Sequence, residues 1–254
     1  MDLKQSDFEK QKWNNYYKEA LDGNGQEHQP SLWWKISDDD SVSIVKKYLN
    51  PSVHCSILEA GCGSGGSSFY LEHAFKDISI TLCDISENAL EFARTITPNQ
   101  LRGNVEYIIS DIVCMPFNDD SFDLTWNVGV LEHYTINEIL QMAAEMTRVT
   151  KIGGYVIIAI PNRRSIATLK AYILGSRFGK LFLFWIPGYR FDSEILYGNR
   201  QLKKILFEKF KRDVFVEFAG NMLWVGAPKK WVKKFNSCFP RSSFSFLTFF
   251  VFKK

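Results

Sequence analysis

The sequence predicts an α/β protein built on a doubly wound, mostly parallel sheet. Strand and helix patterns alternate over residues 55–161, which favours crossover connections between parallel strands. The first strand of this stretch breaks into a glycine loop that leads directly into a helix. Apolar residues make up 46% and charged residues 23% of the 254 residues, so the chain can bury a full core as one globular domain.

The expected core covers residues 51–162. Its strands are predicted at 56–60, 79–84, 104–109, 122–127 and 154–160, and its helices at 66–76, 87–97 and 135–150. Ser86 with Asn88 indicates the start of the second of these helices, and Gly153–Gly154 indicates the end of the third.

Three further segments flank this core. Residues 1–50 form an N-terminal helical cap, whose aromatic residues at helical spacing either pack on the sheet or cover a ligand. Residues 163–198 form a helical, aromatic insertion after the fifth strand, with its aromatics concentrated at 181–191. Residues 199–254 return to the regular pattern, with a helix at 199–210 and strands near 213–219 and 245–252.

The glycine loop lies in residues 57–66, which read Ile-Leu-Glu-Ala-Gly-Cys-Gly-Ser-Gly-Gly. Gly61, Gly63 and Gly66 satisfy the dinucleotide pattern G-x-G-x-x-G, so a nicotinamide-dependent dehydrogenase is one reading. Glu59 opposes it, because a carboxylate there would repel a pyrophosphate, whereas it suits a ligand with a cationic amino-acid end.

Two more carboxylates follow strands of the same sheet. Asp84 ends the second strand, where it can accept hydrogen bonds from both hydroxyls of a ribose. Asp111 follows the third strand, where its carboxylate can take the exocyclic amine of adenine. These positions favour a nucleoside ligand that carries an amino acid.

These residues resemble the motifs of class I S-adenosylmethionine-dependent methyltransferases, most closely the stand-alone small-molecule type (methyltransferase type 11-like). The pattern E-x-G-x-G-x-G stands at 59–65, D-I-S at 84–86, D-I-x-x-M-P-F-x-D-x-S-F-D at 111–123 and V-L-E-H-Y at 130–134. The resemblance covers residues 55–161. It implies a Rossmann-like sheet of seven strands, in which the strands near 213–219 and 245–252 close the sheet as a hairpin pair and the last is antiparallel.

The resemblance also implies a cofactor, S-adenosylmethionine, with S-adenosylhomocysteine as its product. By the family's motifs, the methionine end is lined by Glu59, Gly61 and Gly63. The ribose is held by Asp84 and Ile85, and the adenine by Asp111 and Ile112. Asn127, just past the fourth strand, stands where relatives contact the amino or carboxylate group of the cofactor.

Residues on the acceptor side are harder to assign. His133 lies after the fourth strand, near the expected methyl group, and could act as a general base for a hydroxyl acceptor. It could equally be a helix-start or packing residue. Tyr134, Asn162 and Arg163 lie at adjacent strand ends and could touch the acceptor. Glu132, Asp120 and Asp123 could be offered as a metal or acid–base set, although no metal site assembles from the sequence.

Charge divides unevenly along the chain. Residues 1–162 hold 12 basic and 23 acidic residues, whereas residues 163–254 hold 19 and 5. A basic second half would attract phosphates or anionic lipid headgroups. Residues 229–235, Lys-Lys-Trp-Val-Lys-Lys-Phe, suit a membrane surface, although a solvated segment explains them equally well. Nucleic acid is disfavoured, because no nucleic-acid motif accompanies these residues.

The remaining composition favours a cytoplasmic protein. Its five cysteines form no C-x-x-C pair, its first residues lack a signal-peptide pattern, and no apolar run reaches the roughly 20 residues that span a bilayer. We therefore predict a methyltransferase for a small or lipid-linked metabolite, with an oxygen acceptor preferred. The alternatives are a cofactor-binding module without turnover and the nicotinamide-dependent dehydrogenase.

Overall fold

The computed structural model describes residues 3–23, 32–182, 194–220, 228–238 and 241–254. Its seven strands form one sheet in the order β3-β2-β1-β4-β5-β7-β6. The strands are β1 (Cys55–Ala60), β2 (Ile78–Asp84), β3 (Val105–Ile109), β4 (Phe122–Val128), β5 (Thr150–Pro161), β6 (Val214–Ala219) and β7 (Leu247–Lys253).

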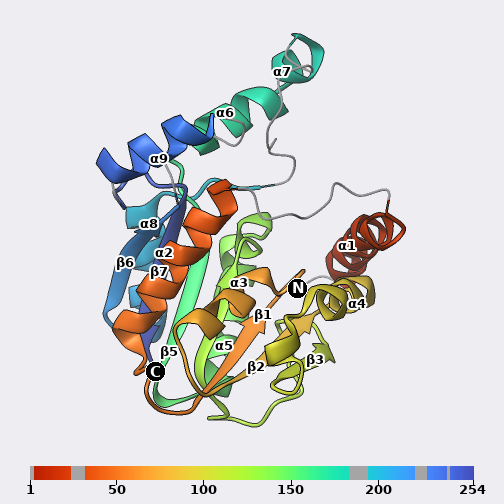
Figure 1. The fold of residues 1–254 in the computed structure, drawn as a ribbon, viewed down its shortest axis with the longest axis vertical. Coiled ribbons are helices and arrows are strands. Elements are labelled where there is room, and N and C mark those ends of the chain that lie inside the picture. The colour runs from red at the N-terminus through yellow and green to blue at the C-terminus, as the bar shows by residue number, and fades with distance from the viewer. Residues whose placement is uncertain (1–2, 24–31, 183–193, 221–227, 239–240) are drawn as a thin grey trace.

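Helices connect and cover these strands (Figure 1). They are α1 (Leu3–Leu21), α2 (Leu32–Tyr48), α3 (Gly66–Phe69), α4 (Glu87–Ile96), α5 (Ile136–Val149), α6 (Ile166–Gly175), α7 (Arg177–Phe182), α8 (Asn199–Phe210) and α9 (Lys229–Cys238). Three short 3-10 turns are η1 (Tyr70–His73), η2 (Asn99–Leu101) and η3 (Leu131–His133).

The strand directions confirm the predicted architecture. β1 pairs in parallel with β2 and β4, while β3 and β5 extend the parallel sheet on either side. β7 is antiparallel to both β5 and β6. The pairing of the last two strands is as expected, but β7 lies between β5 and β6, and α9 separates β6 from β7 in the chain, so the pair is not a tight hairpin.

The core consists of two apolar layers, one on each face of the sheet. Ile44 of α2, Phe69 of α3 and Leu90 of α4 pack on one face. Met142 of α5 and Leu206 of α8 pack on the other. The two-layered covering explains why the central strands read as continuous apolar runs, since parallel strands bury both of their faces.

Two boundaries differ from the sequence prediction. The helix expected at 66–76 is only one turn of α3 followed by η1, because it begins with Gly66, Ser67 and Ser68, which are weak helix formers. The pair Gly153–Gly154 does not end a helix, because α5 stops at Val149 and both glycines lie within β5. A Cβ on Gly154 would lie 2.7 Å from the Asp123 carbonyl oxygen, so close strand approach explains that glycine.

The described part of the expected insertion contains two helices, followed by non-helical residues at 194–198. α6 begins soon after β5 and α7 follows it, and both project from the end of the molecule that lies beyond the carboxyl ends of the parallel strands (Figure 1). Most of the aromatic stretch at 181–191 lies outside the described residues. Within the described part of the chain, no helix is long and apolar enough to cross a membrane.

Candidate functional site

The candidate site begins where β1 ends in the glycine loop. Gly61 and Gly63 adopt positive φ angles of 71° and 51°, which favour glycine. The backbone N–H groups of Gly61 and Cys62 both donate to the Cys83 carbonyl, at 2.7 and 3.0 Å, so the loop folds back against β2. A Cβ on Gly61 would lie 3.0 Å from Ile112 Cδ1, so a larger residue there would require the Ile112 side chain to shift.

Glu59 lies beneath this loop and is almost fully buried, at 3% exposure. Burial raises the pKa of its carboxyl to about 8, against the hydrogen bonds that Ser68 donates to it from side chain and backbone. Among the described residues, Glu59 Oε2 has no hydrogen-bond partner. A buried carboxyl with an unused oxygen is suited to a cationic donor such as an ammonium group.

Asp84 connects the glycine loop to the turn that follows β2. One carboxylate oxygen accepts a 2.8 Å hydrogen bond from the Gly63 N–H, and the other accepts one of 2.8 Å from the Ser86 N–H. Burial raises the pKa of Asp84, while the backbone donors oppose that rise. Each carboxylate oxygen carries two lone pairs, so Asp84 can hold the loop and still accept from two hydroxyls.

Asp111 and Ile112 follow β3 at the same edge. Asp111 Oδ1 accepts a 3.1 Å hydrogen bond from the Val113 N–H, which stabilises the turn that carries both residues. Ile112 is 6% exposed, and its Cδ1 faces Gly61. This arrangement provides an apolar wall and a carboxylate next to the glycine loop.

Asn127 completes the floor of the site from β4. Its side chain is fully buried, and its amide nitrogen donates to the Ala60 carbonyl at the end of β1. Its carbonyl oxygen, Oδ1, has no hydrogen-bond partner among the described residues. Glu59 and Asn127 thus both present an unpaired buried acceptor near the glycine loop.

Helix α1 lies over this site. The Tyr17 hydroxyl would be 2.4 Å from a Cβ on Gly63, so this aromatic residue closes directly on the loop. Burial and the carboxylate of Asp84 raise the pKa of Tyr17 well above its ordinary value. The N-terminal segment therefore packs on the glycine loop itself in this structure.

Asn14 of α1 fastens this cover to the start of α4. Its side-chain oxygen accepts a 2.7 Å hydrogen bond from the Ser86 hydroxyl, and its backbone carbonyl accepts one of 2.9 Å from the Asn88 side chain. Ser86 also caps α4 by accepting from the Ala89 N–H at 3.1 Å, as the sequence predicted. The part of α1 that covers the loop and the turn that carries Asp84 and Ser86 are therefore one connected unit.

Comparison with known proteins identifies this arrangement. Residues 57–154 match the family model described as a methyltransferase domain. The chain is 31% identical over 109 residues to 2-methyl-6-phytyl-1,4-hydroquinone methyltransferase of Synechocystis, covering 43% of this chain and 33% of that protein. The chain carries a class I S-adenosylmethionine-dependent methyltransferase domain.

Two further relatives agree with this assignment. Fatty-acid O-methyltransferase of Mycolicibacterium smegmatis is 27% identical over 138 residues, which cover 52% of this chain and 48% of that protein. The crystal structure of magnesium protoporphyrin IX methyltransferase of Synechocystis with bound S-adenosylhomocysteine superposes with a TM-score of 0.62 at 15% identity, covering 98% and 99% of the two chains. The chain spans a third to a half of the length of the two curated relatives.

The cofactor of this methyltransferase domain is S-adenosylmethionine. The observed residues fit that ligand. Its ammonium group matches the unpaired oxygens of Glu59 and Asn127, which are both acceptors. At Gly61 and Gly63 a Cβ would meet neighbouring side chains, so the loop keeps its close packing only with glycine at these positions.

Of the residues predicted to face the acceptor, His133 ends η3 and is partly exposed. Its ring meets the ring of Trp13 from α1 edge-on, with centroids 6.0 Å apart. Tyr134 follows it and is 8% exposed. Burial and the nearby carboxylate of Glu9 raise the pKa of Tyr134, and its carbonyl accepts a 2.7 Å hydrogen bond from the Tyr197 hydroxyl. His133 is therefore the more accessible of the two.

Asn162 and Arg163 have opposite surroundings although they are neighbours. Asn162 is fully buried, and its amide donates to the carbonyls of Ser243 and Ser245 at 2.9 and 2.8 Å. Its oxygen accepts from the Arg164 N–H at 3.1 Å. Through these bonds Asn162 anchors the segment before β7, and its contact with an acceptor stays a prediction. Arg163 is exposed.

The carboxylates offered as a metal or acid–base set do not come together. Asp123 lies near the amino end of β4. Its carboxylate accepts hydrogen bonds from Ser56 Oγ at 2.8 Å and from Lys151 Nζ at 2.9 Å. Burial acts to raise its pKa, but these hydrogen bonds outweigh it and hold the pKa below its usual value. Among the described residues, no group of three or more possible metal ligands is present. Asp123 is a structural residue.

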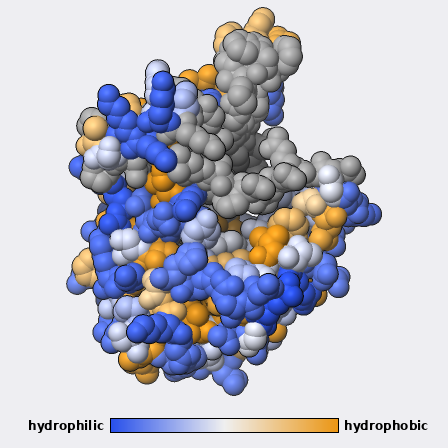
Figure 2. Space-filling view, viewed as in Figure 1, coloured by the Kyte–Doolittle hydropathy of each residue, from blue (hydrophilic) through white to orange (hydrophobic). Residues whose placement is uncertain are grey.

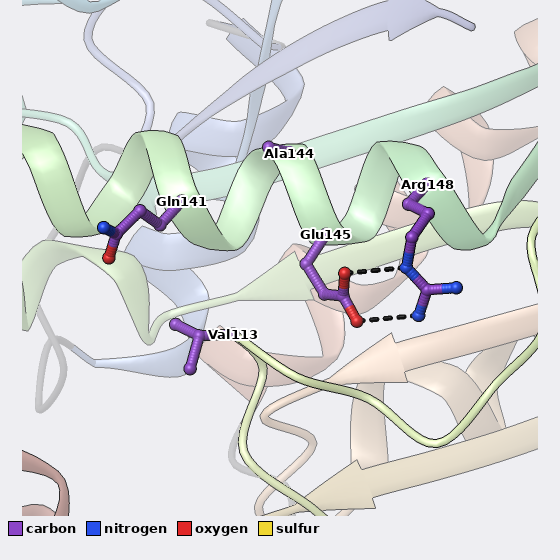
Figure 3. A pocket seen from close by; sticks show the side chains of 5 residues that line it. All are labelled: Val113, Gln141, Ala144, Glu145 and Arg148. Atoms are coloured by element: carbon purple, nitrogen blue, oxygen red, sulfur yellow. Dashed lines mark hydrogen bonds and ion pairs between the residues drawn. The ribbon is translucent and has the colours of Figure 1, made fainter. Parts of the chain in front are cut away.

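A separate surface hollow lies along α5 (Figure 3). It is lined by Val113, Gln141, Ala144, Glu145 and Arg148. Arg148 forms a two-point ion pair with Glu145, with distances of 2.7 and 2.8 Å, and also donates to the carbonyl of Phe117 at 2.8 Å. These bonds fasten the segment after β3 to α5, which gives the hollow a structural explanation.

Sequence reasoning missed two residues of this site. Ser68 hydrogen-bonds Glu59, and Tyr17 closes on Gly63. Ser68 lies within the glycine-rich segment, and a polar residue one turn after the loop could have indicated it. Tyr17 gave only a helical aromatic pattern, which does not reveal the loop that it contacts.

Proposed function

We propose that this protein transfers a methyl group from S-adenosylmethionine to a small or lipid-linked metabolite, with oxygen as the acceptor atom. The observation that carries this proposal is the pair of unpaired buried acceptors, Glu59 Oε2 and Asn127 Oδ1, beside a glycine loop that Asp84 holds in place. The relatives of this chain include 2-methyl-6-phytyl-1,4-hydroquinone methyltransferase and a fatty-acid O-methyltransferase, which supports a small or lipid-linked acceptor.

Each residue of the cofactor side has a proposed task. Glu59 and Asn127 accept hydrogen bonds from the amino group of the methionine end, and Gly61 and Gly63 form the loop that lines it. Asp84, with Ile85 beside it, binds the ribose hydroxyls through its remaining lone pairs. Asp111 accepts from the adenine amine while Ile112 packs against the ring.

When bound, S-adenosylmethionine supplies a methyl group made electrophilic by the sulfonium. The protein then has to align the acceptor and exclude water, which can supply several kcal/mol of rate enhancement. Trp13 and Tyr17 of α1 exclude water from the cofactor side. His133 takes the proton from the acceptor hydroxyl as the methyl group is transferred. Tyr134 and Arg163 line the acceptor side.

Calorimetric titration with S-adenosylhomocysteine tests the cofactor side. We expect micromolar binding, and no binding of NADH in a parallel titration. NADH binding in its place would establish the dehydrogenase reading and end the proposal.

Transfer of a labelled methyl group to extracted metabolites and lipids tests turnover. We expect label in a product whose new bond is an ether or ester. Replacing His133 with Gln should lower kcat, remove the rise of rate with pH and leave affinity for S-adenosylhomocysteine unchanged. Cofactor binding without label in any extract fraction would support a binding module that lacks turnover.

A further inference from the structure

Helix α6 exposes an apolar face to solvent. Its residues Ala167, Thr168, Ala171 and Leu174 are buried against the rest of the protein. The opposite side carries Ile166, Leu169, Tyr172 and Ile173, which are 40%, 57%, 62% and 43% exposed. A helix that is apolar all round is normally buried, so this outer face lacks the cover that its composition calls for.

Helix α7 continues this apolar surface. Phe178, Leu181 and Phe182 are 60%, 67% and 57% exposed. The two phenylalanine rings contact each other, with centroids 5.0 Å apart. Large apolar residues exposed on consecutive helices form a patch of the kind that marks a protein or membrane contact, whereas single exposed apolar residues are ordinary.

Helix α9 combines an exposed tryptophan with lysines. Trp231 is 58% exposed, whereas Val232 is 4% exposed and holds the helix to the protein. Lys230, Lys233 and Lys234 of the same helix are also exposed, and Lys234 follows Trp231 by about one helical turn. Tryptophan close to lysine is typical of residues at the level of lipid headgroups. There the indole ring is partly solvated, and the lysine ammonium binds lipid phosphate.

All three helices lie at one end of the molecule (Figure 1), where hydrophilic residues cover the α9 side in Figure 2. The sequences of α6, α7 and α9 contain basic residues and no acidic ones. Arg163 and Arg164, just before α6, are also exposed. An apolar surface edged by unmixed positive charge is complementary to an anionic bilayer surface.

We propose that α6, α7 and α9 form a membrane-docking face that binds the surface of an anionic lipid bilayer. The apolar side chains of α6 and α7 enter the headgroup region, and the lysines of α9 bind lipid phosphates. A second copy of the chain is disfavoured as the occupant, because self-association would bring like charges together.

The docking face explains how a lipid-linked acceptor would reach the site, and in this respect it rests on the proposed function. α6 begins five residues after β5, at the edge of the sheet that carries the glycine loop. A bilayer held against α6 and α7 therefore lies on the side of the molecule where the acceptor must enter. The headgroup of a membrane lipid would approach His133 without leaving the interface.

Co-sedimentation of the full chain with vesicles tests the docking face. We expect binding to vesicles of phosphatidylcholine with phosphatidylglycerol, weaker binding to phosphatidylcholine alone, and loss with added salt. Each basic residue near an anionic surface strengthens partitioning about fivefold, so Lys230→Glu with Lys234→Glu should weaken it at least about 25-fold. Leu169→Ser with Tyr172→Ser should weaken binding to both kinds of vesicle.

A matched control carries the same charge change elsewhere. Lys76 and Arg102 are exposed and precede β2 and β3, at the opposite edge of the sheet. Lys76→Glu with Arg102→Glu should reduce vesicle binding far less than the α9 pair. Equal loss in both pairs would mean that total charge and not this face drives binding, and would overturn the proposal.

Two other outcomes also overturn it. One is the absence of binding to anionic vesicles at low salt. The other is a concentration-dependent dimer that Leu169→Ser with Tyr172→Ser abolishes, which would assign the face to a second copy. Titration with S-adenosylhomocysteine separates this test from the proposed function: intact cofactor binding without vesicle binding refutes the face alone, and vesicle binding without cofactor binding refutes the function alone.

Discussion

Glu59 and Asp84, which can carry charge, are 3% and 8% exposed, whereas Leu169 and Leu181, which are apolar, are 57% and 67% exposed. The first pair belongs to the glycine loop and its neighbouring turn, and the second to α6 and α7, which project beyond the carboxyl ends of the parallel strands (Figure 1). Both reverse the usual distribution of polar and apolar side chains. Each reversal costs stability, and each occurs where we propose that the chain binds another molecule.

The cofactor region tolerates this cost because backbone donors surround its carboxylates. Asp84 has N–H partners from Gly63 and Ser86, and Glu59 has Ser68. The α6–α7 region has no comparable compensation within the described residues, since its apolar side chains simply face solvent. The cofactor region is therefore a pre-organised polar site, whereas the exposed apolar side chains of α6 and α7 would be stabilised by a partner.

The largest expected effect concerns the polar pocket. Asp84→Ala removes the ribose acceptor and the Gly63 anchor, so affinity for S-adenosylhomocysteine should fall at least tenfold, by about 1.5–3 kcal/mol. Calorimetry measures this loss. Asp123→Ala is the matched control, because it removes a hydrogen-bonded carboxylate from the other edge of the sheet and should lower stability without changing affinity.

Asn162 and Arg163 are neighbours in sequence, one buried and one exposed, and so test the effect of burial on stability. Asn162→Ala leaves buried carbonyls of Ser243 and Ser245 without their donor and should lower the free energy of unfolding by about 1–3 kcal/mol. Arg163→Ala, at an exposed position, should change it by less than about 0.5 kcal/mol. Urea unfolding of both variants checks this, and equal effects would contradict the anchoring role of Asn162.

Gly63→Ala probes the contact between α1 and the loop. The new methyl group meets Tyr17 at a φ of 51°, so the free energy of unfolding should fall by about 1–2 kcal/mol. Gly103→Ala is the control, since a Cβ there meets nothing within 4 Å. Thermal unfolding that shifts equally for both variants would show that Tyr17 does not close on the loop.

A change of slope with pH tests the buried carboxyl of Glu59. The pKa of Glu59 rises from 4.5 to about 8 on folding, so the folded state holds the proton more tightly and stability falls as pH rises through this range. Glu59→Gln should remove up to about 1.4 kcal/mol per pH unit of this fall. Urea unfolding of the ligand-free protein at several pH values between 4.5 and about 8 measures this slope in both proteins.

Affinity for S-adenosylhomocysteine should show the opposite trend. The ligand's ammonium favours ionised Glu59, so wild-type affinity should rise toward pH 8, and Glu59→Gln should flatten that rise. Glu132 is the matched control, because burial raises its pKa to about 8 as well. Glu132→Gln should reduce the pH dependence of the free energy of unfolding but retain the rise in affinity toward pH 8. Loss of that rise in Glu132→Gln would contradict the proposal that Glu59 binds the ammonium group of the ligand.

The sequence allowed the sheet and much of the cofactor site to be predicted. Central strands such as β2 are apolar runs that end in a recognisable polar residue, and the carboxyl ends of parallel strands meet at one edge. Glu59, Asp84 and Asp111 could therefore be grouped before any coordinates were known. Their individual roles toward the cofactor stay predictions.

Other features depend on contacts that the local pattern does not contain. Tyr17 reaches Gly63 across 46 positions, and only the docking of α1 on α4 brings them together. The outer face of α6 was equally hidden, because an apolar helix looks the same in sequence whether a neighbour covers it or not. Asn162 stood at a strand end like a ligand-binding residue, but its partners lie about 80 positions away.

The position of β7 has a consequence for how the chain folds. β7 follows every other strand in sequence yet lies between β5 and β6, and its side chains enter the apolar layers on both faces of the sheet. Until residues 247–253 have been synthesised, β5 presents an unpaired edge and β6 has no place in the sheet. A chain that ends before residue 247 would have an incomplete sheet with an unpaired edge at β5. Such a chain would be prone to aggregation.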